Sequence, residues 1–247
     1  MPALSFLALA PAPAAAQLAV DQAEIFVHPG AVGQGVVSFH VSNESDQLVE
    51  GRVYLGDWDR DEDGENRFLA SGTLPQSCAR YLRVFPLSLR LPPGTGQAVR
   101  ISIDGQADTL SAACWSIVFV ESSVPPPPGG RQIAYVTRLG VKVYLVPSGL
   151  TDDGEVADMA VRAGVVEVRF HNTGGTPLWV GGGVEYRRLD NSVAASDSIP
   201  QFPVLPGADR RVRRRVPPLA PGRYVVLALL DYGGAEIAAG RASVEVP

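Results

Sequence analysis

The sequence predicts an all-β protein built from two tandem immunoglobulin-like β-sandwiches. Short apolar runs with period-two alternation recur along the chain, separated by Gly, Pro, Asn and Asp. They follow one another at intervals of about 8–14 residues, as in sandwiches, and no helical spacing persists beyond about two turns. The runs are too many for one immunoglobulin-like unit, so we expect two units of about seven and six strands.

The first unit is assigned to residues 18–147, and each of its strands is an alternating run that ends at a turn-forming residue. The predicted strands are 23–28, 35–43, 50–58, 80–91, 97–104, 114–122 and 133–147. The Pro-rich stretch 124–130 lies between two strongly apolar runs, so we interpret it as a stiff loop within this unit.

The second unit is assigned to residues 148–247, after a stretch from Val146 to Val156 in which Pro, Gly and charge replace the strand pattern. Its predicted strands are 164–172, 178–189, 210–216, 222–232 and 242–247. Gly181–Gly183 within a strand indicates a bulge or hairpin device. We expect a hairpin with positive φ at Asn172, Gly174 and Gly175. Tyr224 is either a tyrosine-corner-like anchor or a plain core residue.

Residues 1–17 resemble a signal peptide, because an apolar stretch is followed by a small-x-small cleavage pattern that ends at Ala16. No Lys or Arg precedes the apolar stretch, so either the signal is atypical or the true start lies upstream. The run is too short to span a bilayer and no other segment does better, which predicts export and no integral membrane segment.

Composition argues against several function classes. The net charge of −5 disfavours a nucleic-acid binder, and three scattered histidines supply little acid–base or metal chemistry. The motifs of serine hydrolases, zinc proteases and phosphate-binding loops are missing from the sequence. An enzyme is therefore the poorest interpretation, and no cofactor is expected.

Cys78 and Cys114 are the two cysteines of the chain. In an exported protein they are expected first as one disulfide, which would close a loop of roughly 35 residues. Two buried free thiols are the alternative. A metal site is disfavoured because no histidine lies near them.

Two charged stretches could serve as binding sites. The segment Asp57–Leu69 places Asp59, Asp61, Asp63 and Gly64 as in a calcium-binding loop, but Ala70 stands where the bidentate carboxylate should be. A solvated turn is favoured over a weak calcium site. The arginines of Asp209–Val216 indicate either a charged, aggregation-resistant edge strand, which is favoured, or a site for an anionic partner.

Three segments in fixed order resemble the PapD-like family of periplasmic pilus-assembly chaperones. They are Gly94–Ile103 ("GTGQAVRISI"), Cys114–Pro128 ("CWSIVFVESSVPPPP") and Ile133–Pro147 ("IAYVTRLGVKVYLVP"). The resemblance covers residues 18–147 and implies two immunoglobulin-like sandwiches, in keeping with the length of the chain.

The last of these segments is the one to which the resemblance assigns the function. A strand from 133 to 145 is longer than an ordinary sandwich strand, and its first half would protrude as an edge. The resemblance implies that this edge completes an incomplete pilin-like subunit by β-augmentation. The side chains implied to fill the subunit are Ile133, Tyr135, Thr137 and Leu139. An ordinary edge strand that packs on its own sandwich is the alternative.

The resemblance also implies a cationic pair that holds the subunit's terminal carboxylate. Lys142 matches the family's lysine by its distance to Pro147, although a strand lysine that merely snorkels is an equal alternative. The family's arginine near the first strand falls at Glu24, and the one before the closing proline falls at Val146. These departures predict an altered anchor.

Together these observations predict a periplasmic chaperone without cofactor or catalysis. Its expected partners are a secreted pilin-like subunit and an outer-membrane usher, and when free it would be a monomer or self-capped through the edge strand. The alternative is a non-catalytic binding or structural module, secreted or on the cell surface.

Overall fold

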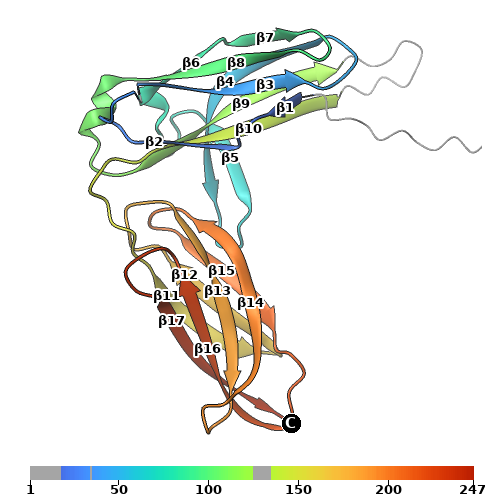
Figure 1. The fold of residues 1–247 in the computed structure, drawn as a ribbon, viewed down its shortest axis with the longest axis vertical. Helices are drawn as coiled ribbons and strands as arrows, with labels where there is room; N and C mark the ends of the chain where they lie inside the picture. The colour runs from blue at the N-terminus through green and yellow to red at the C-terminus, as the bar shows by residue number, and fades with distance from the viewer. Residues whose placement is uncertain (1–17, 34, 125–134) are drawn as a thin grey trace, which may run out of the picture.

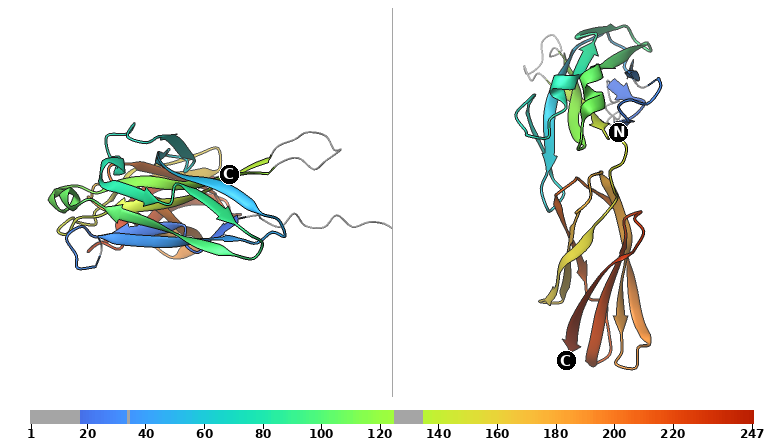
Figure 2. Two further views of the ribbon diagram at one scale, coloured as in Figure 1. Left: turned by 90° about the horizontal axis from the view of Figure 1, so that it is seen from above. Right: turned by 90° about the vertical axis from the view of Figure 1, so that its left-hand side faces the viewer.

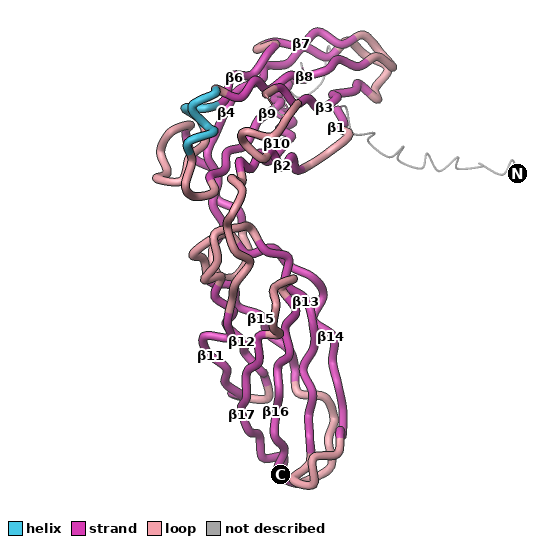
Figure 3. Tube along the Cα trace, turned by 60° about the vertical axis from the view of Figure 1, so that its left-hand side comes forward, coloured by secondary structure: helices cyan, strands magenta, loops and turns pink. Residues whose placement is uncertain are grey.

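A computed structural model describes residues 18–33, 35–124 and 135–247. These residues form two β-sandwiches, β1–β10 and β11–β17, which confirms the predicted fold class (Figure 1). The helices in these ranges are two short 3-10 turns, η1 (Ala79–Tyr81) and η2 (Gly105–Thr109), drawn in cyan in Figure 3. Neither is long enough to cross a membrane.

The first sandwich packs a sheet of order β1-β3-β8-β6 against a sheet of order β2-β10-β9-β4-β5, with β7 paired to β4. Its strands are β1 (Leu18–Val20), β2 (Glu24–Val27), β3 (Val36–Asn43), β4 (Val49–Arg60), β5 (Asn66–Ala70), β6 (Leu82–Phe85), β7 (Ser88–Leu91), β8 (Gly96–Ile103), β9 (Cys114–Val124) and β10 (Tyr135–Leu145). Alternate residues of each strand face the core, so that Val99, Ile101 and Val118 are fully buried.

A disulfide joins Cys78, just before η1, to Cys114 at the start of β9, as the leading interpretation of the cysteines expected. Cys78 and Cys114 are both buried in the first core.

The second sandwich packs a sheet of order β11-β12-β15 against one of order β14-β13-β16-β17. Its strands are β11 (Glu155–Arg162), β12 (Val165–His171), β13 (Leu178–Arg187), β14 (Val193–Val204), β15 (Asp209–Arg215), β16 (Gly222–Asp231) and β17 (Ala238–Val246). The β13–β14 register shifts between Val180 and Gly182, so the predicted glycine bulge is present. The Tyr224 hydroxyl donates to the Ala220 carbonyl at 2.8 Å, which makes this tyrosine a corner anchor.

Several details predicted from the sequence were wrong. The run 80–91 is not one strand: β6 joins one sheet and β7 the other, with the change of sheet at Pro86. The hairpin predicted at Asn172, Gly174 and Gly175 does not form, because β12 and β13 lie in different sheets, and none of the three residues has positive φ. Gly174 is required by close approach, because a Cβ there would lie 2.5 Å from the Thr151 carbonyl oxygen.

The two sandwiches meet at an angle, so the molecule is bent (Figures 1 and 2). An apolar interface cluster fills the contact, with Trp58, Trp115 and Tyr144 of the first sandwich against Leu205 of the second. At the β2 edge, Phe26 stacks on Tyr144 with ring centroids 4.5 Å apart and meets Trp179 edge-on at 5.3 Å. The interface is therefore packed like a core at its centre.

Candidate functional site

The long strand β10 is hydrogen-bonded on both sides over only part of its length. Strand β9 pairs with all of it, from Tyr135↔Val124 to Leu145↔Cys114. Strand β2 pairs with the other edge in parallel, from Lys142↔Glu24 to Leu145↔Val27. Within the described residues, the edge of β10 from Tyr135 to Val141 thus has no partner strand (Figure 1).

The main-chain groups that face this free edge follow from the register. The Lys142 N–H donates to the Ala23 carbonyl at 2.9 Å, on the side of β2. Successive N–H groups along a strand point to opposite sides, so those of Val136, Arg138 and Gly140 point to the free edge. Such an unpaired row of donors and acceptors is a template for another strand.

The odd-numbered side chains of β10 behave differently along the strand. Val141, Val143 and Leu145 are fully buried in the first core, and Leu139 packs against it while partly exposed. Thr137 is half-buried. Only the backbone of Tyr135 is described, and Ile133 lies outside the described residues. The strand therefore leaves the core of its own sandwich at about Leu139.

The opposite face of β10 carries a polar network around Glu121 of β9. The Tyr54 hydroxyl donates to Glu121 Oε2 at 2.7 Å, and Arg52 Nη2 lies 2.5 Å from Oε1. Arg138 Nε is 3.5 Å from the same carboxylate, and its guanidinium lies 5.3 Å from the Phe119 ring centroid. The Tyr54 hydrogen bond and then Arg52 lower the pKa of Glu121. The Glu121 carboxylate is therefore held ionised, and its contacts order the side chains on this face of β10.

Lys142 and Glu24 lie side by side on β10 and β2. Lys142 Nζ is 3.0 Å from Glu24 Oε1, and it lies 4.6 Å from the Trp58 ring centroid. The Tyr144 hydroxyl donates to the same Glu24 oxygen at 3.4 Å. Burial and then the charge of Glu24 raise the pKa of Tyr144, which therefore stays a donor. The lysine charge is thus already balanced within the chain.

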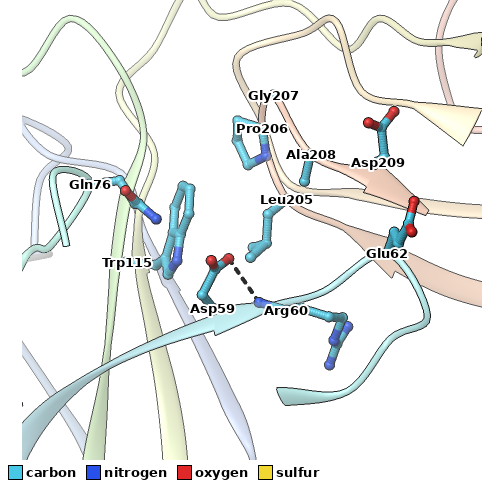
Figure 4. A pocket seen from close by; sticks show the side chains of 10 residues that line it. All are labelled: Asp59, Arg60, Glu62, Gln76, Trp115, Leu205, Pro206, Gly207, Ala208 and Asp209. Carbon is cyan, nitrogen blue, oxygen red and sulfur yellow. Dashed lines mark hydrogen bonds between the residues drawn. The ribbon is translucent and has the colours of Figure 1, made fainter. Parts of the chain in front are cut away.

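A polar pocket of about 460 Å³ opens between the two sandwiches (Figure 4). One wall is Trp115 with Gln76, the facing wall is the turn from Leu205 to Asp209, and Asp59 and Glu62 border it. The Trp115 indole donates to the Trp58 carbonyl at 3.0 Å, so that wall is fixed. The pocket brings both signs of charge together, and we assign it no ligand.

The acidic segment is a structured turn. The Asp61 carboxylate accepts from the N–H groups of Asp63 and Glu65 at 3.1 and 2.9 Å, and these backbone bonds lower its pKa. No cluster of metal-binding side chains is found among residues 18–33, 35–124 and 135–247. The turn is not simply solvated, however, because its tip contacts the arginines of β15.

The long strand and Lys142 were predicted from the sequence, and the fold brings further residues next to them. The network of Glu121, Arg138 and Tyr54 was not predicted, because these residues belong to three separate runs that only the sheet joins. Glu24 was singled out as a mismatch, and the register places it opposite Lys142.

No model of a known protein family matches the sequence, and no curated protein resembles it. Solved structures do resemble the fold. A chain from the chaperone–tip adhesin complex of CFA/I fimbriae biogenesis matches with a TM-score of 0.56 and 14% identity, covering 94% of this chain and 100% of that one. The class 5 fimbriae chaperone CfaA matches at 0.54 and 14%, covering 93% and 99%.

A third match is a chain from the Salmonella enterica SafA pilin–SafB chaperone complex, with a TM-score of 0.50, 12% identity and coverage of 93% and 96%. The likeness extends over almost the full length of both chains. The protein therefore has the two-sandwich fold of the fimbrial chaperones.

Proposed function

We propose that this protein is a periplasmic chaperone that captures a pilin-like or related secreted β-subunit along the free edge of β10. The observation that carries the proposal is the row of unpaired main-chain groups from Tyr135 to Val141. The fold shared with fimbrial chaperones supports it. Residues 1–17 would direct export, and the units 18–147 and 148–247 would be the two domains.

In this proposal the subunit adds one strand to β10. The N–H and C=O groups of Val136, Arg138 and Gly140 would supply the main-chain hydrogen bonds, which give affinity without sequence preference. Ile133, Tyr135, Thr137 and Leu139 would enter the subunit's incomplete core and give specificity. The change at Leu139 from buried to partly exposed supports this division of the strand. An outer-membrane usher would then receive the loaded chaperone, and no cofactor or catalysis takes part.

The role of Lys142 as an anchor for a carboxylate is altered in this proposal. A carboxylate that approached Lys142 would meet Glu24, whose oxygen lies 3.0 Å from the ammonium. The incoming carboxylate and Glu24 would repel each other at the same ammonium group. Lys142 would therefore bind a subunit carboxylate only if Glu24 were displaced. We expect capture to depend mainly on the strand edge.

The edge is tested by Val136→Pro, with Val136→Ala as the matched control. Proline removes one N–H that points to the free edge and leaves the β9 ladder intact, because proline is tolerated where the N–H faces solvent. Val136 is 61% exposed, so its side chain contributes little to the fold. After co-expression with a pilin-like subunit encoded near its gene, we expect stoichiometric co-purification with the alanine variant and its loss with the proline variant.

Tyr135→Asp provides a second arm, because a charge at that position would oppose entry into an apolar subunit core. If both variants co-purify with the subunit as well as the unchanged protein does, edge capture is wrong. That result would favour the non-catalytic surface binding module.

The anchor is tested by Glu24→Gln. Removing the like charge should tighten binding of a synthetic peptide of the subunit's last residues by about tenfold, or about 1.4 kcal/mol. The same peptide with an amidated end should show no gain. Equal gains for both peptides, or no gain, would contradict the proposed role of Glu24.

A further inference from the structure

The two charged segments that the sequence analysis interpreted separately contact each other across the interface. Strands β4 and β5 form a hairpin that runs beyond the first sandwich toward the second (Figures 1 and 2). Its tip is the acidic turn between Arg60 and Asn66, and it reaches the arginine-rich strand β15. Almost 150 residues separate the two segments in the sequence.

Two hydrogen bonds to the main chain of the tip, one from the backbone and one from a side chain of β15, dock it on the exposed edge of that strand. The Arg211 N–H donates to the Glu62 carbonyl at 2.6 Å, and Arg210 Nη1 donates to the same oxygen at 2.9 Å. Strand β15 is the last strand of the sheet β11-β12-β15, so this edge would otherwise be open. The tip thus occupies part of a sheet edge in the neighbouring sandwich.

Side chains of opposite charge also face each other across the same contact. Arg211 forms an ion pair with the Glu62 carboxylate. Arg213 Nη1 is 2.9 Å from Asp63 Oδ1, and its Nε is 2.8 Å from Glu167 Oε2 on β12. Most of these side chains are a quarter to a half exposed, so salt should weaken the network.

Gly64 fits the tip to its partner. It has φ +96, a conformation that L side chains rarely adopt, and a Cβ there would collide with the Arg210 guanidinium. Glycine is therefore needed both for the turn and for the close approach of the arginine.

The contact lies at the far edge of the sheet from the other interdomain contact. Phe26 meets Trp179 at the β2 edge, whereas the hairpin extends from the β4–β5 edge of the same sheet. Between them is the apolar interface cluster around Leu205. Supports at both edges of one sheet resist rocking of the second sandwich.

We infer that the β4–β5 hairpin is an electrostatic strut, in which Glu62 and Asp63 engage Arg210, Arg211 and Arg213 to fix the angle between the two sandwiches. The arginines of β15 are the receiving surface for the strut. This role is independent of whether β10 captures a subunit.

The test measures the distance between the sandwiches in solution. Spin labels on cysteines introduced at Leu87 and Leu189, which are 64% and 78% exposed, report the interdomain distance distribution by pulsed electron resonance. We expect one narrow distribution for the otherwise unchanged protein and a broad one for Glu62→Arg with Asp63→Arg. About 1 M salt should broaden the distribution of the otherwise unchanged protein, but less than the two substitutions do. Salt screens the charges and leaves the hydrogen bonds to the Glu62 carbonyl in place.

Charge exchange makes the test specific. Adding Arg211→Glu and Arg213→Glu to the reversed hairpin, together with Glu167→Arg because Glu167 faces both arginines, should narrow the distribution again. Reversing Arg223 and Glu245, an exposed pair within the second sandwich, should leave it unchanged. A narrow distribution in the reversed hairpin with a native near-ultraviolet spectrum would overturn the inference. So would a failure of the exchange to restore the distance.

Discussion

The two sandwiches share a buried asparagine at an equivalent turn. In the first, Asn43 Nδ2 donates to the Gln47 and Leu91 carbonyls at 2.7 and 2.8 Å, and its Oδ1 accepts from the Ser45 N–H. In the second, Asn172 Nδ2 donates to the Thr176 and Val204 carbonyls at 2.8 and 3.1 Å, and its Oδ1 accepts from Gly174. In each sandwich, therefore, a buried asparagine side chain supplies hydrogen bonds to the main-chain groups of the same kind of turn.

The sandwiches differ in their last strands and in their cross-link. More than half of the outer edge of β10, residues 135–141, is unpaired in the described residues, and a disulfide lies in the core behind it. Strand β17 pairs with β16 over its full length but ends its sheet, so its other edge also has no partner strand in the described residues; β11 of the facing sheet packs beside it, where Gly240 lies against Val156. Both sandwiches therefore have unpaired strand edges, and the cross-link is the clearer difference: a disulfide reinforces the first sandwich, whereas the second contains no cysteine.

The largest expected difference between the sandwiches comes from removing the disulfide with Cys78→Ser and Cys114→Ser. The cross-link spans 36 residues, and a loop of this size contributes about 3–4 kcal/mol by restricting the unfolded chain. Denaturant unfolding followed by hydrogen exchange should show this loss in peptides of residues 18–124. Peptides of residues 155–247 should keep their stability, and an equal loss there would contradict the assignment of the cross-link to one sandwich.

The shared asparagines should have equal effects in separate places. Asn43→Ala and Asn172→Ala each leave buried main-chain groups without partners, at a cost of about 1–3 kcal/mol. The same exchange experiment should show destabilisation of the first sandwich by one variant and of the second by the other. An effect of only one of them would mean that the two turns are not equivalent.

The smallest effects are expected at two exposed cross-strand ion pairs. Arg90 and Glu50 in the first sandwich, and Arg223 and Glu245 in the second, are each 3.5 Å apart and largely exposed. Double-mutant cycles to alanine should give less than about 0.5 kcal/mol for either pair, because solvent screens them. A larger value at one pair would indicate a local difference between the sheets.

Local patterns in the sequence predicted much of the fold. Apolar runs located β3, β8, β9 and β10. In β3 and β8 the buried residues alternate with a period of two, whereas β9 is buried on both faces from Cys114 to Val120 and has a nearly continuous apolar run. Strands β5, β11 and β14 were missed, since most of their side chains are exposed or half-buried and the alternation is weak. The bulge at Gly181–Gly183 and the anchor at Tyr224 were recognisable because turn chemistry is local.

From the sequence alone followed the all-β class, one disulfide as the first interpretation of the two cysteines, and the unusual length of the strand that ends at Leu145. Tertiary structure decided that β2 covers only the last four residues of this strand, that Glu24 neutralises Lys142, and that the acidic turn meets the arginines of β15. The physical reason is range. Burial periodicity and turn preference act over a few residues, whereas register and the angle between sandwiches bring together charges more than 100 residues apart.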